Sequence, residues 1–503
     1  MYLAIDLGTS AVKVGLFDRT GGWASLETVE YSLSTPAPQW VECDLSTYWG
    51  AVVRGIGAAL QTARGAGPID IAALSISSQG ETLVVLDRDG LPLRPAIVWL
   101  DNRASDEAEE LKNYFGLDEI YRRTGQIESI PTWTAAKISW LAKHEPGVHE
   151  RAGRFVLLED WLIYRLTGAP IGEHSLYVTT LLLDIRRRQW WLEMLDHIGI
   201  DVGQLSPLVA PGVVAGLLSP SVASELGLPP ALPVVAGALD QVLAATGAAN
   251  IRPGLLTENT GTVLGLATCV PSIPLQRAHG LPMCLHVIPD MYCAQPCGQT
   301  AGLVLRWFGD NFYGAPSARF AVHPPYYDII NEARDIAAGA DGLIVVPHLA
   351  GAQFPEFDPS ASAAIVGLTL AHTRGHVCRA VLEAVAFMLR SALQAMRSAD
   401  IHLDELTSLG NSAESDIWTQ IKADVCQLPV RRLECSEPSL LGAAMLCAVA
   451  VGDYSCVAEA SSAMVRSRDV LKPDRRVAGA YDDAFANYQR VSVALRLTPA
   501  VLG

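Results

Sequence analysis

The chain contains few basic residues for its size. Lysine and arginine together number 37, against 53 aspartates and glutamates, so the formal net charge is −16. An acidic surface is repelled by nucleic-acid phosphates and by anionic lipid headgroups. The composition therefore argues against nucleic acid or a membrane surface as the main partner.

Long hydrophobic runs are also absent. The most apolar stretch, GAAMLCAVAVG at 442–452, is well short of the roughly 20 residues that span a bilayer. The first residues, MYLAIDLG, lack the basic region and the long apolar core of a signal peptide, and they are typical of a β-strand. We expect a cytoplasmic protein.

Paired cysteine motifs are missing too. None of the ten cysteines occurs in a CxxC pair, and the closest two, Cys293 and Cys297, have three residues between them. This spacing alone gives weak support to a zinc site. Buried, reduced thiols are the favoured interpretation.

What the chain does contain is enough apolar material for two cores. Half of its 503 residues are hydrophobic and 18% are charged, which is typical of a well-buried globular protein. Because a single core stops growing at about 250–300 residues, this length predicts two domains.

Strand patterns open two similar units. AIDLG leads through a turn at 8–10 to AVKVGLFD, and WASLETVEYSL follows as a third strand. A second strand-rich unit is predicted to begin with LPVVAGALD at 232–240 and to continue as GLLTENTGTVLGLATCV. Its turn at 259–262 resembles the first turn. The sequence therefore suggests a duplicated architecture with a cleft between the halves and a boundary near 245–255.

The first turn has the residues of an anion site. Gly8 can adopt positive φ, and the small Thr9 and Ser10 leave backbone amides free to face phosphates. The carboxylate of Asp6 would point to the same place, which makes sense if a cation such as Mg²⁺ lies between. The alternative is a plain hairpin with a solvated aspartate, and the motif alone favours neither.

A candidate general base follows a later strand. Asp240 comes at the end of PVVAGAL and opens a segment of small residues, where it could take a proton from a substrate hydroxyl. The alternative use, as a helix N-cap, is the commoner one for such a residue. Two further turns, at 260–262 and at 410–413, could present amides to a phosphate and to a nucleoside.

The order of these pieces resembles the FGGY carbohydrate kinases over about residues 1–455. DLGTSAVKVGLFD is similar to the family's first phosphate motif, and TAAKISW (134–140) to its first signature. The segment at 346–387 resembles the second signature nearly throughout. GNSAESDIWTQIKADVC, followed by SEPSLLGAA at 436–444, resembles the adenosine region.

The resemblance implies an α/β fold of two actin-like ATPase (ribonuclease-H-like) domains flanking a cleft. We expect them at 1–248, with the sugar and the first phosphate motif, and at 249–503, with the nucleotide and a terminal helix. The domains would close on ATP, Mg²⁺ and a small sugar or polyol. A homodimer is left open as the assembly.

The resemblance also implies residue roles. Asp240 matches the catalytic base, and Asp6, with Asp240, the acidic residues near the metal. The residues implied for ATP come from both phosphate hairpins, the stretch near the nucleotide and the adenosine loop: Gly8, Thr9, Ser10, Lys13, Gly261, Thr262, Ala301, Gly302, Gly410, Asn411 and Ala413. The family usually has Gly-Gly-Gly-Ala at 410–413, so the added side chains here put the fit of adenosine in question.

The substrate region has mixed features. The implied sugar-binding residues are Gln79, Glu81, Trp99, Asp101, Thr132, Asp240 and Gln241. The segment at 77–87 and the Asp-Gln pair at 240–241 resemble glycerol kinases, whereas WLDNR at 99–103 resembles xylulokinases. For Glu81, an exposed hairpin carboxylate is the alternative. A ketopentose such as D-xylulose leads, and a C3–C5 polyol, a sugar acid, or a non-catalytic sugar-binding regulator on the same scaffold follow.

Overall fold

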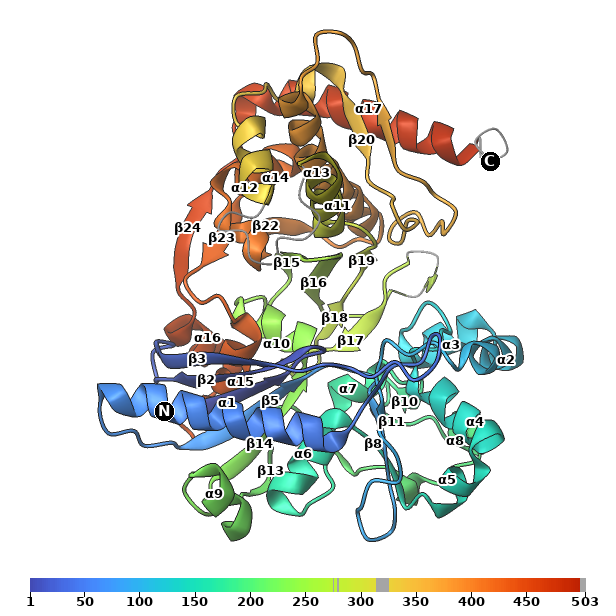
Figure 1. Ribbon diagram of the computed structural model, residues 1–503, viewed down its shortest axis with the longest axis vertical. Helices are drawn as coiled ribbons and strands as arrows, with labels where there is room; N and C mark the ends of the chain where they lie inside the picture. Colours follow the sequence, from blue (N-terminus) through green and yellow to red (C-terminus); the bar gives the residue numbers. More distant parts are fainter. Residues whose placement is uncertain (275, 278–279, 314–324, 498–503) are drawn as a thin grey trace.

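The computed structural model describes residues 1–274, 276–277, 280–313 and 325–497, which form two lobes (Figure 1). A six-stranded sheet in the first lobe has the order β13-β14-β5-β1-β2-β3. Its strands are Tyr2–Leu7 (β1), Ala11–Phe17 (β2), Trp23–Glu30 (β3), Ala73–Ser78 (β5), Val214–Leu217 (β13) and Pro233–Leu239 (β14).

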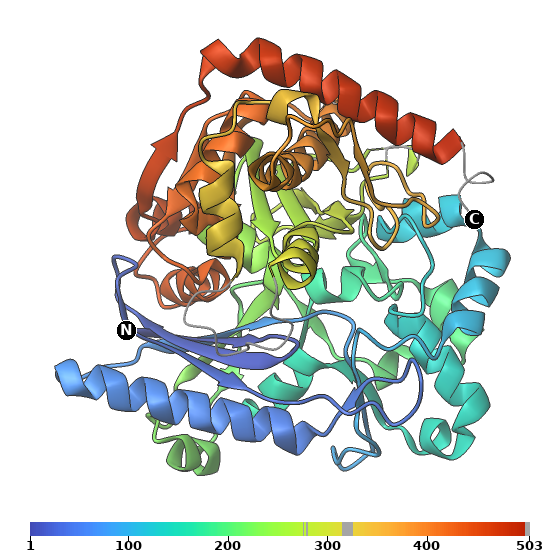
Figure 2. The same ribbon diagram turned by 45° about the horizontal axis from the view of Figure 1, so that its top comes forward.

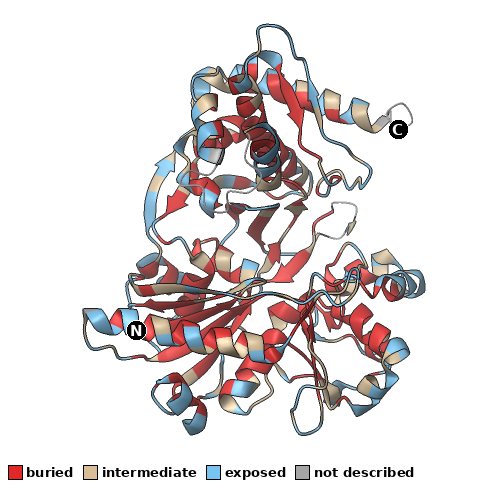
Figure 3. Ribbon diagram, viewed as in Figure 1, coloured by how far each residue is buried: buried red, intermediate tan, exposed pale blue. Residues whose placement is uncertain are grey.

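The sheet of the second lobe has the order β17-β18-β16-β15-β22-β23-β24, with β19 pairing β16. Its strands are Gly254–Thr260 (β15), Leu264–Val270 (β16), Met283–Leu285 (β17), Tyr292–Ala294 (β18), Cys297–Gly298 (β19), Leu403–Leu409 (β22), Val430–Leu433 (β23) and Ser467–Leu471 (β24). Figure 3 shows buried residues concentrated in the strands of both sheets.

The two sheets share a central plan. In the first, β1 pairs antiparallel with β2 and parallel with β5. In the second, β15 pairs antiparallel with β16 and parallel with β22. The turns at 8–10 and 261–263 therefore hold equivalent places, and the predicted duplication is confirmed. One expectation is wrong: the segment 232–240 forms β14 and joins the first sheet, because it pairs with β5.

Strand β1 is buried on both faces, and its alternation assigns each side chain a side. Leu3, Ile5 and Leu7 pack with helix α1 (Leu45–Ala66). Tyr2 and Ala4 belong to the other core. Asp6 shares their face, and it meets the start of helix α15 (Pro438–Ala450) there. The period of two thus explains why a carboxylate stands beside that helix.

Helix α15 belongs to the later part of the chain but lies in the first lobe. It packs against β1, β5 and β14 and crosses helix α10 (Asp240–Gly247) closely. A Cβ on Gly442 would lie 2.3 Å from the Leu243 carbonyl oxygen, and one on Gly247 would lie 1.9 Å from the Pro438 oxygen. Helix α16 (Val457–Met464) lies beside α15 (Figure 1). The division of the chain at 248/249 stays a prediction.

Other helices of the second lobe cover its sheet. They are Gly302–Phe312 (α11), Pro325–Ala333 (α12), Arg374–Ser398 (α13), Asp416–Cys426 (α14) and Ala478–Leu497 (α17). Helix α17 runs along the outside of this lobe (Figure 2) and is the predicted terminal helix; residues 498–503 lie outside the described part. Among the described helices, none combines the length and apolar character that a membrane span requires.

The first lobe carries further short elements. Its helices are Ser105–Phe115 (α2), Leu117–Thr124 (α3), Thr134–His144 (α4), Pro146–Arg151 (α5), Leu158–Thr167 (α6), His174–Val178 (α7), Leu192–Ile198 (α8) and Pro220–Leu226 (α9). Its short strands are Glu42–Cys43 (β4), Leu83–Leu86 (β6), Ala96–Ile97 (β7), Arg154–Leu157 (β8), Gly172–Glu173 (β9), Leu183–Asp184 (β10), Gln189–Trp190 (β11) and Leu208–Val209 (β12). A separate antiparallel pair of strands, Ile344–Val346 (β20) and Ala364–Val366 (β21), belongs to the second lobe.

The end of β14 is held by buried side chains as well as by its pairing with β5, which resumes at Ala238 and Leu239. The pairing of β14 with β13 covers residues 233–235, and the register with β5 shifts after Val235. Beyond that point, the Gly237 amide donates to Glu159 at 2.8 Å and the Leu239 amide donates to the Ser175 hydroxyl at 3.0 Å. Ser175 in turn donates to Glu173. Buried side chains thereby fix the residue that precedes Asp240.

Glu159, Asp160 and Glu173 are buried, and their pKa values lie above the ordinary range of a carboxyl group. Burial raises the pKa of Glu173 to about 8, although hydrogen bonds from Ser175 oppose the shift. Burial also raises the pKa of Asp160 to about 7. For Glu159 both burial and the Glu173 carboxylate raise the pKa. The folded protein therefore binds more protons than the unfolded chain over the window between the ordinary and the raised values.

We predict that Gly442→Ala destabilises the fold by about 1–3 kcal/mol, because the new methyl group meets backbone that cannot move aside. Urea unfolding monitored by circular dichroism measures the change. Gly57→Ala in α1 is the matched control, since a Cβ there meets nothing within 4 Å and should add about 0.5–1 kcal/mol of stability. Equal effects of the two substitutions would contradict the close crossing.

The buried acids predict that stability falls as pH rises. Because the folded pKa values of Glu173 and Asp160 exceed the unfolded ones, their contribution is full below about pH 4 and is lost by about pH 8. Thermal melts from pH 5.5 to 8.5 should show a midpoint that falls by a few degrees, and Glu173→Gln should flatten the curve. Glu109→Gln, on the exposed side of α2, controls for net charge. An unchanged slope in Glu173→Gln contradicts the assignment.

Candidate active site

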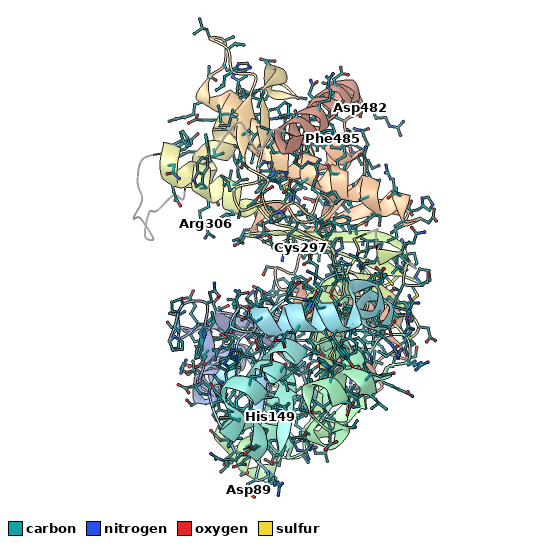
Figure 4. All side chains as sticks on the ribbon, turned by 90° about the vertical axis from the view of Figure 1, so that its right-hand side faces the viewer. Asp89, His149, Cys297, Arg306, Asp482 and Phe485 are labelled. Carbon is teal, nitrogen blue, oxygen red and sulfur yellow. The ribbon has the colours of Figure 1, made fainter. Side chains whose placement is uncertain are left out.

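A cavity of about 600 Å³ lies where the lobes meet. Figure 4 shows the lobes from the side, with Cys297 at the edge of the second lobe that faces the first. Four segments line the cavity: β1 and β2, the start of α10, the end of β15, and the stretch from β22 to α15. The predicted site residues among them are Asp6, Lys13, Asp240, Gln241, Gly261, Gly410, Asn411 and Ala413.

Asp240 is the first residue of α10 and is partly exposed to this cavity. Its carboxylate accepts a hydrogen bond from the Gln241 amide at 2.6 Å. Burial raises the pKa of Asp240 to about 8, and the carboxylates of Asp6 and Glu81 add to the shift. Asp6 and Asp240, the two side chains that sequence analysis assigned to the metal, therefore line one cavity, and Glu81 lies close enough to raise the pKa of Asp240 further.

Asp6 is held by two hydroxyls from opposite parts of the chain. Ser77 of β5 donates to one carboxylate oxygen at 2.7 Å, and Ser439 of α15 donates to the other at 3.1 Å. Burial raises the pKa of Asp6 despite these bonds. Lys13, its neighbour across the β1–β2 hairpin, forms an ion pair of 2.6 Å with Glu437.

The first hairpin joins the predicted phosphate residues to the predicted sugar residues. The Gly8 carbonyl accepts a hydrogen bond from the Gln79 amide group at 3.1 Å. The Thr9 hydroxyl accepts one from the Trp99 indole at 2.8 Å. Ser10 is exposed. Gly8, Thr9 and Ser10 are not in the lining of the cavity, which Asp6 and Lys13 reach from the adjoining strands.

The second hairpin is held by the start of α11. The Gly302 amide donates to the Gly261 carbonyl at 2.7 Å, and the Ala301 amide donates to the Thr262 carbonyl at 3.1 Å. A Cβ on Gly302 would lie 2.3 Å from the Gly261 oxygen. Ala301 and Gly302 thus contact the hairpin directly, and Gly261 alone of these residues lines the cavity.

The loop after β22 also depends on a glycine that lies close to a neighbouring residue. Gly410 has φ 71°, which favours glycine, and a Cβ there would lie 2.7 Å from the Asn259 side-chain oxygen. The next residues, 411–414, form a 3₁₀ turn. Asn411 and Ala413 line the cavity, whereas Ser412 is buried behind it.

Glu81 is buried and adopts φ 54°, a conformation in which a non-glycine side chain is strained. The buried Lys137 of α4 donates to the Glu81 carbonyl at 2.9 Å and to the Val98 carbonyl at 3.1 Å. Burial raises the pKa of Glu81 to about 7 and lowers the pKa of Lys137 to about 7. The exposed-hairpin interpretation of Glu81 is wrong, because the side chain lies inside.

Of the predicted sugar residues, Asp240 and Gln241 line the cavity, whereas Gln79, Glu81, Trp99, Asp101 and Thr132 do not. Asp101 is fully buried, where it pairs with Arg103 at 2.7 Å and accepts the Val41 amide at 2.5 Å. Thr132 lies in the loop before α4, and its neighbour Trp133 lines a second cavity of about 430 Å³. Their roles in sugar binding stay predictions.

Sequence reasoning missed four residues at this site. Glu437 and Ser439 lie within the recognised SEPSLLGAA segment, where Pro438 at the start of a helix was the available signal. Glu258 and Lys422 form a fully buried ion pair of 2.7 Å beneath the cavity. No local pattern connects them, since they come from β15 and α14.

The donor set suits a hard cation shared with phosphates. In the described part of the chain, no three His, Cys, Asp or Glu side chains gather closely enough to hold a metal by themselves. Asp6 and Asp240 instead offer two carboxylates at one end of the cavity. Mg²⁺ is commonly bound by one or two carboxylates together with substrate phosphates.

Comparison with known proteins places the chain in a family. Residues 1–247 match the N-terminal domain of the FGGY family of carbohydrate kinases, and residues 260–451 match its C-terminal domain. A xylulose kinase of Staphylococcus epidermidis is 29% identical over 98% of this chain and 96% of the relative. A glycerol kinase of Ralstonia nicotianae is 32% identical over 90% of each.

Solved structures agree. A xylulose kinase of Rhodospirillum rubrum superposes with a TM-score of 0.90 over 99% of both chains at 26% identity. The two-domain α/β fold predicted from the sequence is thereby confirmed as actin-like. The chain therefore belongs to the FGGY family of carbohydrate kinases, enzymes that transfer a phosphoryl group to an alcohol.

Proposed function

We propose that this protein phosphorylates a hydroxyl of a ketopentose, with D-xylulose as the leading acceptor and ATP as the donor. The observation that carries the proposal is the meeting of Asp240 and Asp6 with Gly261 and the 410–413 loop around one cavity. The relative and the solved structure named xylulose kinase support the acceptor. The proposal includes a cytoplasmic location, a homodimer and domains at 1–248 and 249–503.

In this proposal Asp240 is the general base. Its carboxylate accepts the proton of the acceptor hydroxyl as the oxygen attacks the γ-phosphorus, and ADP departs with the electron pair of the broken P–O bond. A raised pKa makes this carboxylate a stronger base than an exposed aspartate. Asp6, which Ser77 and Ser439 hold in place, would bind Mg²⁺ with Asp240. Bound Mg²⁺ would neutralise charge on the phosphates.

The backbone supplies the grip on the nucleotide. We assign the hairpins at 8–10 and 261–262 to the phosphates, with Lys13, and the segment 301–302 to support of the second hairpin. Gly410, Asn411 and Ala413 would face adenosine. For the sugar we assign Glu81 and Gln241 as direct ligands. The proposed sugar pocket is completed by Gln79, Trp99, Asp101 and Thr132. Gln79 and Trp99 also hold the first hairpin, and Asp101 also holds the 99–103 segment through Arg103.

A C3–C5 polyol is the second candidate. The Asp-Gln pair at 240–241 resembles glycerol kinases, and the relative with 32% identity carries that name. A sugar acid and a non-catalytic regulator follow. The regulator is the least favoured, since a binding protein has little use for a base at position 240.

We predict that ADP release with Mg·ATP, measured across ketoses, polyols and aldonic acids, is fastest with D-xylulose. Asp240→Asn should reduce kcat by about 10²–10⁴, the usual contribution of a general base, because the amide cannot accept the proton. Gln241→Ala is the matched comparison, and it should raise the KM of the sugar more than it lowers kcat. Wild-type turnover by Asp240→Asn would refute the assigned base.

The pH profile offers a separate prediction. Because Asp240 must lose its proton to act and its pKa is about 8, kcat/KM for Mg·ATP should rise from pH 6, reach half its maximum near pH 8 and level off above about pH 9. With saturating sugar and Mg²⁺, the inflection in kcat should move to lower pH, since a nearby cation favours the carboxylate. A flat profile from pH 6 to 9 in both parameters would contradict this role.

A further inference from the structure

A fully buried lysine lies directly beneath the nucleotide side of the cavity. Lys422 of α14 has no exposed surface, and its ammonium group donates to the Glu258 carboxylate at 2.7 Å. It also donates to the hydroxyls of Thr260 and Ser412, each at 3.0 Å. An ammonium has three protons, so these three acceptors satisfy it completely.

The acid of this pair is equally well occupied. Glu258 of β15 accepts from Lys422 and Ser408 on one oxygen and from the Thr260 hydroxyl, at 2.7 Å, on the other. The network therefore connects β15, β22, the turn at 411–414 and α14. A buried charged network whose members are all satisfied favours one arrangement of the elements that it joins.

Two of these elements are the walls of the proposed ATP site. Thr260 is the last residue of β15 and immediately precedes Gly261, whereas Ser412 lies in the loop assigned to adenosine. Because the Ser412 hydroxyl points inward to Lys422, it does not fill the cavity. This contact explains how Ser412 adds no side chain to the cavity, whereas Asn411 lines it.

We propose that Lys422 is a positioning residue for the nucleotide, which acts through Ser412 and Thr260 to hold the adenosine loop and the second phosphate hairpin at a fixed separation. Lys422 does not touch ATP. Its loss is expected to weaken nucleotide binding and leave sugar binding unchanged. The inference rests on the proposed function, because it needs the nucleotide in this cavity.

The mildest test removes only the link to the loop. In Ser412→Ala, we expect the Kd of Mg·ADP, measured by isothermal titration calorimetry, to rise roughly tenfold, the factor that corresponds to one hydrogen bond. The KM of ATP should rise in parallel, with the KM of the sugar and kcat within about twofold of the wild type. Unchanged Mg·ADP affinity in Ser412→Ala would overturn the inference.

A double-mutant cycle separates positioning from general stability. Lys422→Met should weaken Mg·ADP at least as much as Ser412→Ala, and adding Ser412→Ala to Lys422→Met should cause little further loss. Independent, additive losses would overturn the inference. Should Lys422→Met not fold, Ser412→Ala alone still decides. Thr419→Val is the matched control, because its buried hydroxyl on the same helix has no hydrogen-bond partner.

Binding of Mg·ADP to the wild-type protein distinguishes a failure of the proposed function from a failure of the proposed role of Lys422. If it binds no Mg·ADP, the proposed function fails. If it binds Mg·ADP and both variants bind equally well, only the role of Lys422 fails.

Discussion

The contact between α10 and α15 is the constraint on which this site depends. Gly247 and Gly442 let the two helices meet backbone to backbone, so that no side chain separates them. One helix begins with Asp240, and the other brings Ser439 to Asp6. Because both helix starts point to the same cavity, the distance between the proposed base and the proposed metal ligand is set by main-chain packing, which varies little with side-chain motion.

Two buried lysines, Lys137 and Lys422, fix the loops around the site. Lys137 donates to the carbonyls of Glu81, before β6, and Val98, after β7. On the nucleotide side, Lys422 joins Glu258 and Thr260 of β15 to Ser412 of the 411–414 turn. Removing one partner of a buried ion pair such as Glu258–Lys422 typically costs about 3–5 kcal/mol, since the other charge is left without compensation. Because the desolvation of both charges offsets much of their attraction, this pair contributes less to net stability than to the choice of a single loop geometry. The strained Glu81 backbone persists because the hydrogen bond from Lys137 to its carbonyl helps to hold it in place.

Much of the site could be predicted because its signals are local. The alternation in YLAIDL, the small turn after it, and an aspartate between PVVAGAL and a run of small residues located segments that line the cavity, whereas the roles of Asp6 and Asp240 came from the family resemblance and stay predictions. What failed or was missed depends on partners far away in the sequence. The sheet that β14 joins is decided by its pairing with β5, which the pattern of 232–240 does not encode. Glu258 and Lys422 are 164 residues apart, and the Asp101 carboxylate accepts a hydrogen bond from the Val41 amide, 60 residues away.

The path of the chain between the lobes has a consequence for how this gene could be divided. After β23 the backbone returns to the first lobe as α15 and α16 and then re-enters the second sheet as β24. A fragment that ended at residue 247 would expose the buried face of β1 and β5 that α15 covers. The two halves of the chain therefore cannot be exchanged as they stand. A split, permuted or swapped variant would have to include residues 438–464 with the first half.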